Sequence, residues 1–328
     1  MKNLFDYATK ELSQDAFLIW LFENADDAEL GEISKRLLAS MVNLDSNYSI
    51  SPNDVSDVKA QGQCEKMDIV VDFKLKGIQS VLVIEDKVVS HEHDNQLTKY
   101  KSIVLNKWNW GDYKNRPSFF VYYKTRDIDE GEKAKVAESG WKNFGFDAIK
   151  AFWEEYQDHP NLIVSQYARH VVNCWNDANN ERLPSGNNID KWLGFFNRTL
   201  RKKISVDCDV WTGVTYFGYA FFCVRPKGKI DEKIPYLEIR SRDCLDGKLE
   251  AKILMYGADP TYLAPIREAI RANEKKGIFK GDYGSKRNKQ VAHTFRDSSA
   301  FTNVSEDGFI NLTDALIKEY LTLVGAVL

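Results

Sequence analysis

The stretch VLVIEDKVV, residues 81–89, contains a continuous run of β-branched and other apolar residues that ends in three adjacent charges. Such a run predicts a short strand that is buried on both faces. Period-two alternation places Glu85 and Lys87 on one face of this strand and Asp86 on the other. Because buried charges are costly unless they are compensated, these side chains need partners. A metal ion that takes oxygen ligands, next to a phosphate group that attracts cations, would provide them.

Three strand patterns follow one another closely, at residues 54–60, 66–75 and 79–87, with turn-forming residues at 61–63 and 76–77. Connections this short favour antiparallel hairpins. Asp68 lies at the start of the second strand, and Glu85 lies at the end of the third. Antiparallel pairing brings the start of one strand beside the end of the next, so the topology predicts that Asp68 and Glu85 are neighbours.

A helix is expected after these strands, over residues 90–105, and a further buried strand over residues 117–125. Gln96 and Tyr100 are one helical turn apart, so both can face the same site. The order of helix, three strands, helix and strand predicts an α/β core whose last strand is reached by a crossover connection.

The N-terminal segment, residues 3–25, has apolar residues at helical spacing. Glu11 and Asp15 are one turn apart at the border of this apolar stripe, where they could also be solvated helix-edge residues. Ser13 could act as an N-cap that breaks the segment into two helices. A second helix is expected over residues 30–42.

A linker-like segment rich in Asn, Pro, Ser and Gly spans residues 179–188. We therefore expect two domains, residues 1–180 and 181–328. Helices are expected before the linker at 147–157 and 161–179. After it, the patterns predict strands at 209–214, 216–225, 234–242 and 249–255, helices at 262–275 and 311–327, and a basic loop at 276–289.

The composition is that of a globular protein, with 43% hydrophobic and 28% charged residues among 328. A net charge of −3 gives no general attraction to nucleic acid, so any such surface must be a local patch. Five scattered cysteines without a C-x-x-C pair favour a reducing cytoplasm. No apolar run approaches the ~18–20 residues that cross a bilayer, and no signal peptide is recognisable. We expect a cytoplasmic protein without a membrane partner.

Acid-x-Lys triplets carry little information alone, because others such as Asp57–Lys59 and Glu250–Lys252 occur in the chain and are expected on the surface. The triplet at Glu85–Lys87 differs from them. It follows the most continuous apolar strand, it pairs with Asp68 by topology, and the helix with Gln96 and Tyr100 comes next. The combination carries the prediction.

These motifs resemble the PD-(D/E)xK nuclease superfamily over roughly residues 1–150. The resemblance lies in MDIVV at 67–71, VIEDKV at 83–88, and QLTKY at 96–100, which matches the Q-x-x-x-Y element of the RecB-like branch. The segment ELSQDAFLIWL at 11–21 is similar to the acidic first helix of bacterial members. Met67 replaces the proline that gives the superfamily its name. The implied fold is a restriction-endonuclease-like mixed-sheet core, αβββαβ, followed here by an α+β domain with an antiparallel sheet.

The resemblance implies a metal site that physical chemistry supports. Asp68 and Glu85 would be carboxylate ligands of Mg²⁺, for which Mn²⁺ would substitute, and the backbone carbonyl of Asp86 would help. Glu11 would complete the metal site, with Asp15 as the alternative. The metal would neutralise the scissile phosphate and lower the pKa of a bound water.

The implied roles of the other residues are catalytic. Lys87 would orient the attacking water and stabilise developing negative charge. Gln96 and Tyr100 would position the nucleic-acid backbone and the active-site side chains.

Other motifs offer weaker candidates. His91 and His93 do not share a helix face, which favours solvent exposure over metal binding. No phosphate-binding loop or nucleophile elbow is present. Two basic stretches could bind phosphates or be solvated loops. The residues we propose from them are Arg201, Lys202, Lys280, Lys286, Arg287 and Lys289.

The sequence therefore predicts a Mg²⁺-dependent endonuclease that hydrolyses phosphodiester bonds of DNA. Family resemblance suggests a role in restriction, repair or defence against phage. Two alternatives stay open: an RNA nuclease, including one that cleaves tRNA, and a nucleic-acid-binding module that does not cut. A homo-oligomer or a regulatory partner also remains open.

Overall fold

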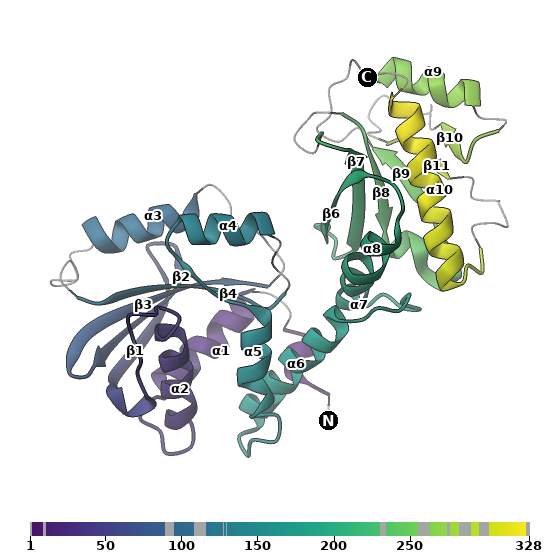
Figure 1. Ribbon diagram of the computed structural model, residues 1–328. Coiled ribbons are helices and arrows are strands. Elements are labelled where there is room, and N and C mark those ends of the chain that lie inside the picture. Colours follow the sequence, from purple (N-terminus) through teal and green to yellow (C-terminus); the bar gives the residue numbers. More distant parts are fainter. Residues whose placement is uncertain are drawn as a thin grey trace. The chain divides into compact units, whose positions relative to one another are not determined.

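The computed structural model describes residues 2–8, 11–88, 95–107, 116–126, 128, 130–229, 234–254, 261, 263–273, 276–281, 290–294 and 302–325. The chain divides into two compact units, Met1–Asn176 and Asp177–Leu328 (Figure 1). The boundary lies near the end of helix α6, Leu162–Ala178, just before the segment rich in Asn, Pro, Ser and Gly.

The first unit is built on a mixed sheet whose described strands follow chain order, β1-β2-β3-β4-β5. Their bounds are Val55–Cys64, Met67–Leu75, Ile78–Lys87, Ser118–Lys124 and Lys142–Phe144. The first three strands are antiparallel, as expected from their short connections. Strand β4 lies parallel to β3, and β5 lies parallel to β4, so a crossover connects β3 to β4.

Two-residue turns fix the register of the hairpins. Lys76 and Gly77 both have positive φ, at 49° and 80°, which is the conformation of a type I′ turn. The turn expected at 61–63 is wrong, because β1 continues to Cys64 and the chain reverses at Glu65-Lys66. Gly62 has another role. A Cβ there would lie 2.8 Å from Cδ1 of Ile19, so the missing side chain lets the first helix pack close to the strand.

Helices cover both faces of this sheet (Figure 1). On one face lie α1, α2, α5 and α6, with bounds Glu11–Glu23, Gly31–Val42, Phe146–Glu154 and Leu162–Ala178. On the other face lie α3, Gln96–Ser102, with its π-helical extension Ile103–Lys107, and α4, Glu130–Glu138. Side chains of Val83, Leu97, Phe120 and Trp141 form a core between the sheet and this second layer. Strand β5 and helix α4 were not expected from the sequence.

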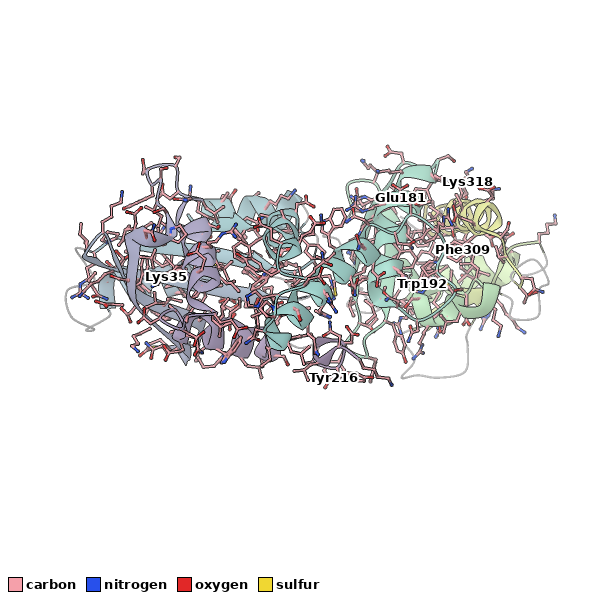
Figure 2. The ribbon with its side chains drawn as sticks, turned by 90° about the horizontal axis from the view of Figure 1, so that it is seen from below. Lys35, Glu181, Trp192, Tyr216, Phe309 and Lys318 are labelled. Atoms are coloured by element: carbon pink, nitrogen blue, oxygen red, sulfur yellow. The ribbon has the colours of Figure 1, made fainter. Side chains whose placement is uncertain are left out.

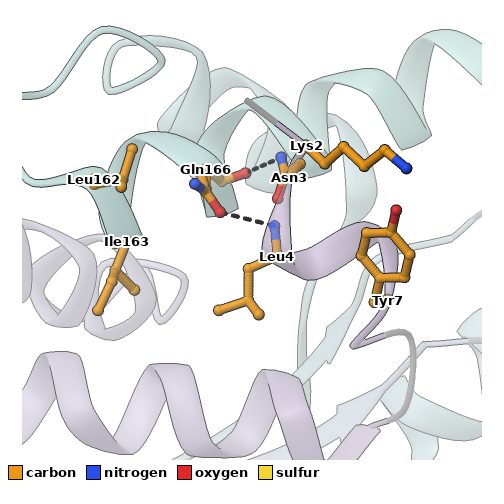
Figure 3. Close-up of a pocket in the computed structure, with 7 residues that line it drawn as sticks. All are labelled: Lys2, Asn3, Leu4, Tyr7, Leu162, Ile163 and Gln166. Carbon is orange, nitrogen blue, oxygen red and sulfur yellow. Dashed lines mark hydrogen bonds between the residues drawn. The ribbon is translucent and has the colours of Figure 1, made fainter.

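The N-terminus is not one continuous helix. A 3₁₀ turn, Leu4–Asp6, precedes α1, which begins at Glu11 and not at Ser13. Gln166 of α6 holds the turn through two hydrogen bonds of 2.7 Å. Its backbone carbonyl accepts one from the side-chain amide of Asn3, and its side-chain carbonyl accepts the other from the backbone amide of Leu4. Figure 3 shows residues that line a cavity beside this anchor. The volume of this cavity is about 400 Å³. None of the residues that line this cavity belongs to the acidic triplet, Glu85–Lys87, or is its neighbour in the sequence. A second 3₁₀ turn, Pro52–Asp54, leads into β1.

The second unit contains an antiparallel sheet with the order β10-β11-β9-β8-β7-β6 in the described part of the chain. The strands are β6 Cys208–Val214, β7 Ala220–Pro226, β8 Tyr236–Arg240, β9 Ala251–Leu254, β10 Phe279–Gly281 and β11 Gln290–Thr294. Four of them match expected strands, although residues 216–219 form a turn instead of the start of a strand. Strands β10 and β11 were not expected.

Helices cover one face of the second sheet. They are α7 Ile189–Gly194, its π-helical extension Phe195–Leu200, α8 Arg201–Lys203, α9 Leu263–Asn273 and α10 Glu306–Gly325, and a 3₁₀ segment, Ser241–Gly247, follows β8. Trp192 and Phe309, both labelled in Figure 2, belong to the core between the sheet and these helices. Phe222 of β7 belongs to the same core. No helix in the described residues is long and apolar enough to cross a membrane.

Candidate active site

The strand register brings the predicted acidic residues together. Ile69 pairs with Ile84, so Asp68 at the start of β2 lies next to Glu85 at the end of β3. The Nζ of Lys87 lies 2.5 Å from Oε1 of Glu85 and 3.3 Å from Oδ2 of Asp68. It also lies 3.0 Å from the backbone carbonyl oxygen of Asp86. The three oxygens proposed as metal ligands thus converge on one cationic atom.

This cluster is removed from water. Glu85, Asp86 and Lys87 are buried, and Asp68 is partly buried. Burial raises the pKa of Glu85 to about 7, and the charge of Asp68 adds to this rise while that of Lys87 opposes it. Burial lowers the pKa of Lys87, but the Glu85 and Asp68 carboxylates outweigh that effect and raise it above its usual value. Lys87 is therefore held as an ammonium ion. The Asp86 amide also donates a hydrogen bond to Asp68, at 3.1 Å.

The donor set fits a hard divalent cation. Oε2 of Glu85 is buried and has no hydrogen-bond partner among the described residues, so it retains an unused acceptor. No three His, Cys, Asp or Glu side chains in the described parts of the chain are grouped so as to hold a metal ion by themselves. Mg²⁺, however, is commonly bound by one or two carboxylates and keeps waters or substrate phosphates as its other ligands. Asp68, Glu85 and the Asp86 carbonyl provide such a set.

Helix α1 brings two more carboxylates to the end of β3. Glu11 accepts a hydrogen bond from the backbone amide of Val88, at 3.3 Å, which places it directly after the acidic triplet. Asp15 is buried one turn further on. Burial, followed by the charge of Asp68, raises its pKa to about 7. Both residues thus lie close to the cluster. Asp15 is the more deeply buried of the two, and its carboxyl lies against that of Asp86.

The opposite face of β3 carries a buried polar chain that sequence reasoning missed. Gln14 donates to Asp86 Oδ1, at 2.5 Å, and accepts a hydrogen bond from the Tyr167 hydroxyl, at 3.2 Å. The Tyr167 and Tyr123 hydroxyls lie 3.2 Å apart, and Trp153 Nε1 donates to Tyr123 at 3.0 Å. These contacts link β3 and β4 to α1, α5 and α6. They hold the side chain of Asp86 on the face of β3 away from Glu85. The sequence feature that pointed to these contacts is the period-two alternation of side chains in β3, which puts Asp86 on the opposite face from Glu85.

Helix α3 borders the cluster. The Gln96 amide donates to the Tyr100 hydroxyl, at 2.9 Å, so the two residues form one unit on the helix. Burial is the main cause of a raised pKa of Tyr100, and the charges of Glu85 and Asp68 contribute to it. Tyr100 is therefore within electrostatic reach of the acidic pair.

A second buried ion pair flanks the cluster and was also missed. The parallel register places Tyr122 beside Glu85 and Lys124 beside Lys87. The Lys124 ammonium lies 3.0 and 2.8 Å from the two carboxylate oxygens of Glu132, on α4. The Tyr122 hydroxyl donates to the same carboxylate at 2.5 Å. The lysine that ends the apolar strand SFFVYYK repeats the pattern at Lys87 and could have suggested a buried partner.

The proposed nucleic-acid-binding residues belong to the second unit. Arg201 and Lys202 are exposed on α8, and Lys280 is exposed on β10. The other proposed residues, Lys286, Arg287 and Lys289, lie outside the described residues, as do His91 and His93.

Comparisons with known proteins address the first unit. A family model described as the PD-(D/E)XK nuclease superfamily matches residues 2–171. No curated protein and no solved structure matches the chain. The matched segment covers more than half of the chain and includes the whole carboxylate and lysine cluster. The chain therefore belongs to the PD-(D/E)XK nuclease superfamily.

Proposed function

We propose that the protein is a divalent-metal-dependent endonuclease that hydrolyses phosphodiester bonds of DNA, with Mg²⁺ as its metal and Mn²⁺ as a substitute. The convergence of Asp68, Glu85 and the Asp86 carbonyl on the ammonium of Lys87 carries this proposal. An intact trio also argues against a module that only binds nucleic acid, because such a module has no need for these three side chains.

Asp68, Glu85 and the carbonyl of Asp86 would hold the metal. When bound, the metal neutralises the scissile phosphate and lowers the pKa of a water molecule. Lys87 donates hydrogen bonds to the attacking water and to a non-bridging phosphate oxygen, and its raised pKa keeps it charged for this role. Its flexible stem allows the ammonium to leave the carboxylates when a divalent cation takes its place.

Glu11 is proposed as the additional carboxylate of the metal site, with Asp15 as the alternative. Both lie beside the cluster, and the hydrogen bond from Val88 to Glu11 supports the first choice. Glu11→Gln and Asp15→Asn separate the two. Under this proposal Glu11→Gln lowers the cleavage rate at limiting Mg²⁺ more than Asp15→Asn does, and the reverse order would transfer the role to Asp15.

Gln96 and Tyr100 are proposed to position the backbone of the substrate, as the resemblance to the RecB-like branch suggests. Their mutual hydrogen bond supports a joint role. The basic residues Arg201, Lys202 and Lys280, with Lys286, Arg287 and Lys289, are proposed as phosphate contacts. Charge reversal of Lys286 and Arg287 should weaken binding and flatten its salt dependence, and an unchanged affinity would remove them from the interface. Restriction, repair or defence against phage is the proposed biological setting.

The decisive experiment compares the wild-type protein with Lys87→Ala on single- and double-stranded DNA and RNA. The wild-type protein should cleave DNA with Mg²⁺ or Mn²⁺ and should not cleave it with EDTA. Lys87→Ala should lose cleavage, whereas Lys74→Ala, which removes an exposed lysine of the adjacent strand, should retain it. Cleavage that persists in EDTA or in Lys87→Ala would refute the proposed mechanism. Preferential cleavage of RNA would keep the mechanism and change the substrate.

A further inference from the structure

The turn between β6 and β7 presents two adjacent aromatic rings to solvent. Tyr216 is 98% exposed and Phe217 is 76% exposed (Tyr216 is labelled in Figure 2). Two backbone hydrogen bonds close this turn. The amide of Gly218 donates to the carbonyl of Thr215 at 2.8 Å, and the amide of Thr215 donates to the carbonyl of Tyr219 at 2.8 Å. Gly218 has φ of 77°, a value that a side chain would disfavour. The turn therefore holds both rings outward, where they contact each other edge to face with their centres 5.5 Å apart.

More rings lie next to this turn. The guanidinium of Arg242 lies over the ring of Tyr219, 5.2 Å from its centre. Phe221 lies across the backbone of Gly213, where a Cβ would be 2.6 Å from Cζ of Phe221. Phe221 also pairs in register with Arg240. We call this group the aromatic tip; its members are Tyr216, Phe217, Tyr219, Phe221, Arg240 and Arg242.

The outward charge of the aromatic tip is positive. Arg240 forms an ion pair with Glu238, but the arginine side chain is 28% exposed and the carboxylate only 6%. Arg242 pairs with Asp243 in the same manner, with 44% and 12% exposed. In both pairs the guanidinium is more exposed than its partner, so solvent meets cations beside Tyr219 and Phe221. Acidic surfaces and phosphates are attracted to such a site.

We propose that the aromatic tip binds unpaired bases of a nucleic acid, by stacking on the rings and by pairing backbone phosphates with the arginines. This inference rests on the proposed function, since it concerns the binding of a nucleic acid that the protein is proposed to cleave. Every base has a flat face, so stacking on aromatic rings does not require a particular base sequence. Each stacked base contributes between about fivefold and a hundredfold in affinity. The rings can stack on the base of a nucleotide, and the exposed guanidinium groups can pair with its phosphate. A purely apolar partner would offer the arginines no anion.

The test uses the full chain in EDTA, which prevents metal-dependent cleavage, and labelled single-stranded DNA and RNA. The double variant Tyr216→Ser with Phe217→Ser should weaken binding at least tenfold in fluorescence anisotropy. It should also abolish the quenching of 2-aminopurine placed in the oligonucleotide. Tyr7→Ser, which removes an exposed aromatic residue from the first unit, is the matched control and should change the affinity less than twofold. A blunt duplex should be affected less than the single strand.

Equal affinity of the double variant and the wild-type protein for the single strand would overturn the inference. A variant that changes only the self-association of the protein, and not this affinity, would overturn it as well. An equal loss of duplex binding would overturn the preference for unpaired bases. Because both rings are exposed, the variant should unfold at the wild-type temperature. Cleavage by the wild-type protein with Mn²⁺ is measured separately. If the wild-type protein does not cleave but the double variant binds more weakly, the proposed function alone is refuted. If the wild-type protein cleaves and the double variant binds equally well, the inference alone is refuted.

Discussion

Lys87→Met offers a direct test of how the carboxylate cluster is balanced. The substitution keeps the length of the side chain and removes the ammonium that lies 2.5 Å from Glu85 and 3.3 Å from Asp68. Removing one partner of a buried ion pair costs about 3–5 kcal/mol when the other charge remains ionised. The pKa of Glu85 is already about 7, and loss of the lysine raises it further, so protonation relieves part of that cost. The loss of unfolding free energy should therefore be larger at pH 8 than at pH 6.

The same substitution should strengthen binding of a divalent cation. Unit charges 4 Å apart interact by roughly 4 kcal/mol at an effective dielectric constant near 20, and a divalent ion doubles this value. Movement of the flexible lysine removes much of the repulsion in the wild-type protein. Even so, about 1.4 kcal/mol of residual repulsion corresponds to tenfold in affinity. Lys87→Met should thus bind Mn²⁺ at least about tenfold more tightly while losing nuclease activity.

Thermal unfolding with and without Mn²⁺ measures both effects. At saturating Mn²⁺, the rise in melting temperature should exceed that of the wild-type protein by about 3 °C or more, since 1 kcal/mol corresponds to about 2–4 °C for a domain of this size. Lys74→Met, which removes an exposed lysine paired with Asp57, should behave as the wild-type protein does. A smaller rise for Lys87→Met than for the wild-type protein would refute the assignment of these oxygens to one cation site.

Three further predictions concern the same unit. In EDTA, the melting temperature should fall between pH 5 and pH 8, because the folded protein keeps protons on Glu85 and Asp15, each with a pKa of about 7, that the unfolded chain has already released. Glu85→Gln should make this profile shallower, Glu85→Gln combined with Asp15→Asn should make it shallower still, and a rise over the same range would contradict the prediction. Asp68→Ala should abolish the rise in melting temperature with Mn²⁺, whereas Asp57→Ala at an exposed position should keep it. Lys124→Met should reduce the free energy of unfolding in urea by about 3–5 kcal/mol, because it leaves the carboxylate of Glu132 buried without its cation; a loss below about 1 kcal/mol would show that the pair contributes no more than a surface one.

The buried polar contacts around β3 show which features were beyond sequence reasoning. The contact between Gln14 and Asp86 joins residues 72 positions apart, and its geometry depends on how α1 packs against the sheet. Gly62 looked like a turn residue, yet it is the point where Ile19 approaches the strand. Such close approaches between helix and sheet leave no periodic pattern in the sequence. The pair of Lys124 and Glu132 was missed because it needs both the parallel register of β4 and the short helix α4.

The sequence by itself determined the features that arise from local patterns. The apolar run before Glu85 predicted the strand, alternation separated Asp86 from Glu85 and Lys87, and the short connections predicted the antiparallel pairing that brings Asp68 alongside. Only the tertiary structure decided which partners surround this end of the sheet: Asp15 and Gln14 from α1, and Lys124 with Glu132 from β4 and α4. The physical reason is that hydrogen bonds and periodicity within a strand or hairpin depend on neighbouring residues. Burial, ion pairing and the pKa of each carboxyl group depend instead on side chains that meet only when distant segments pack together.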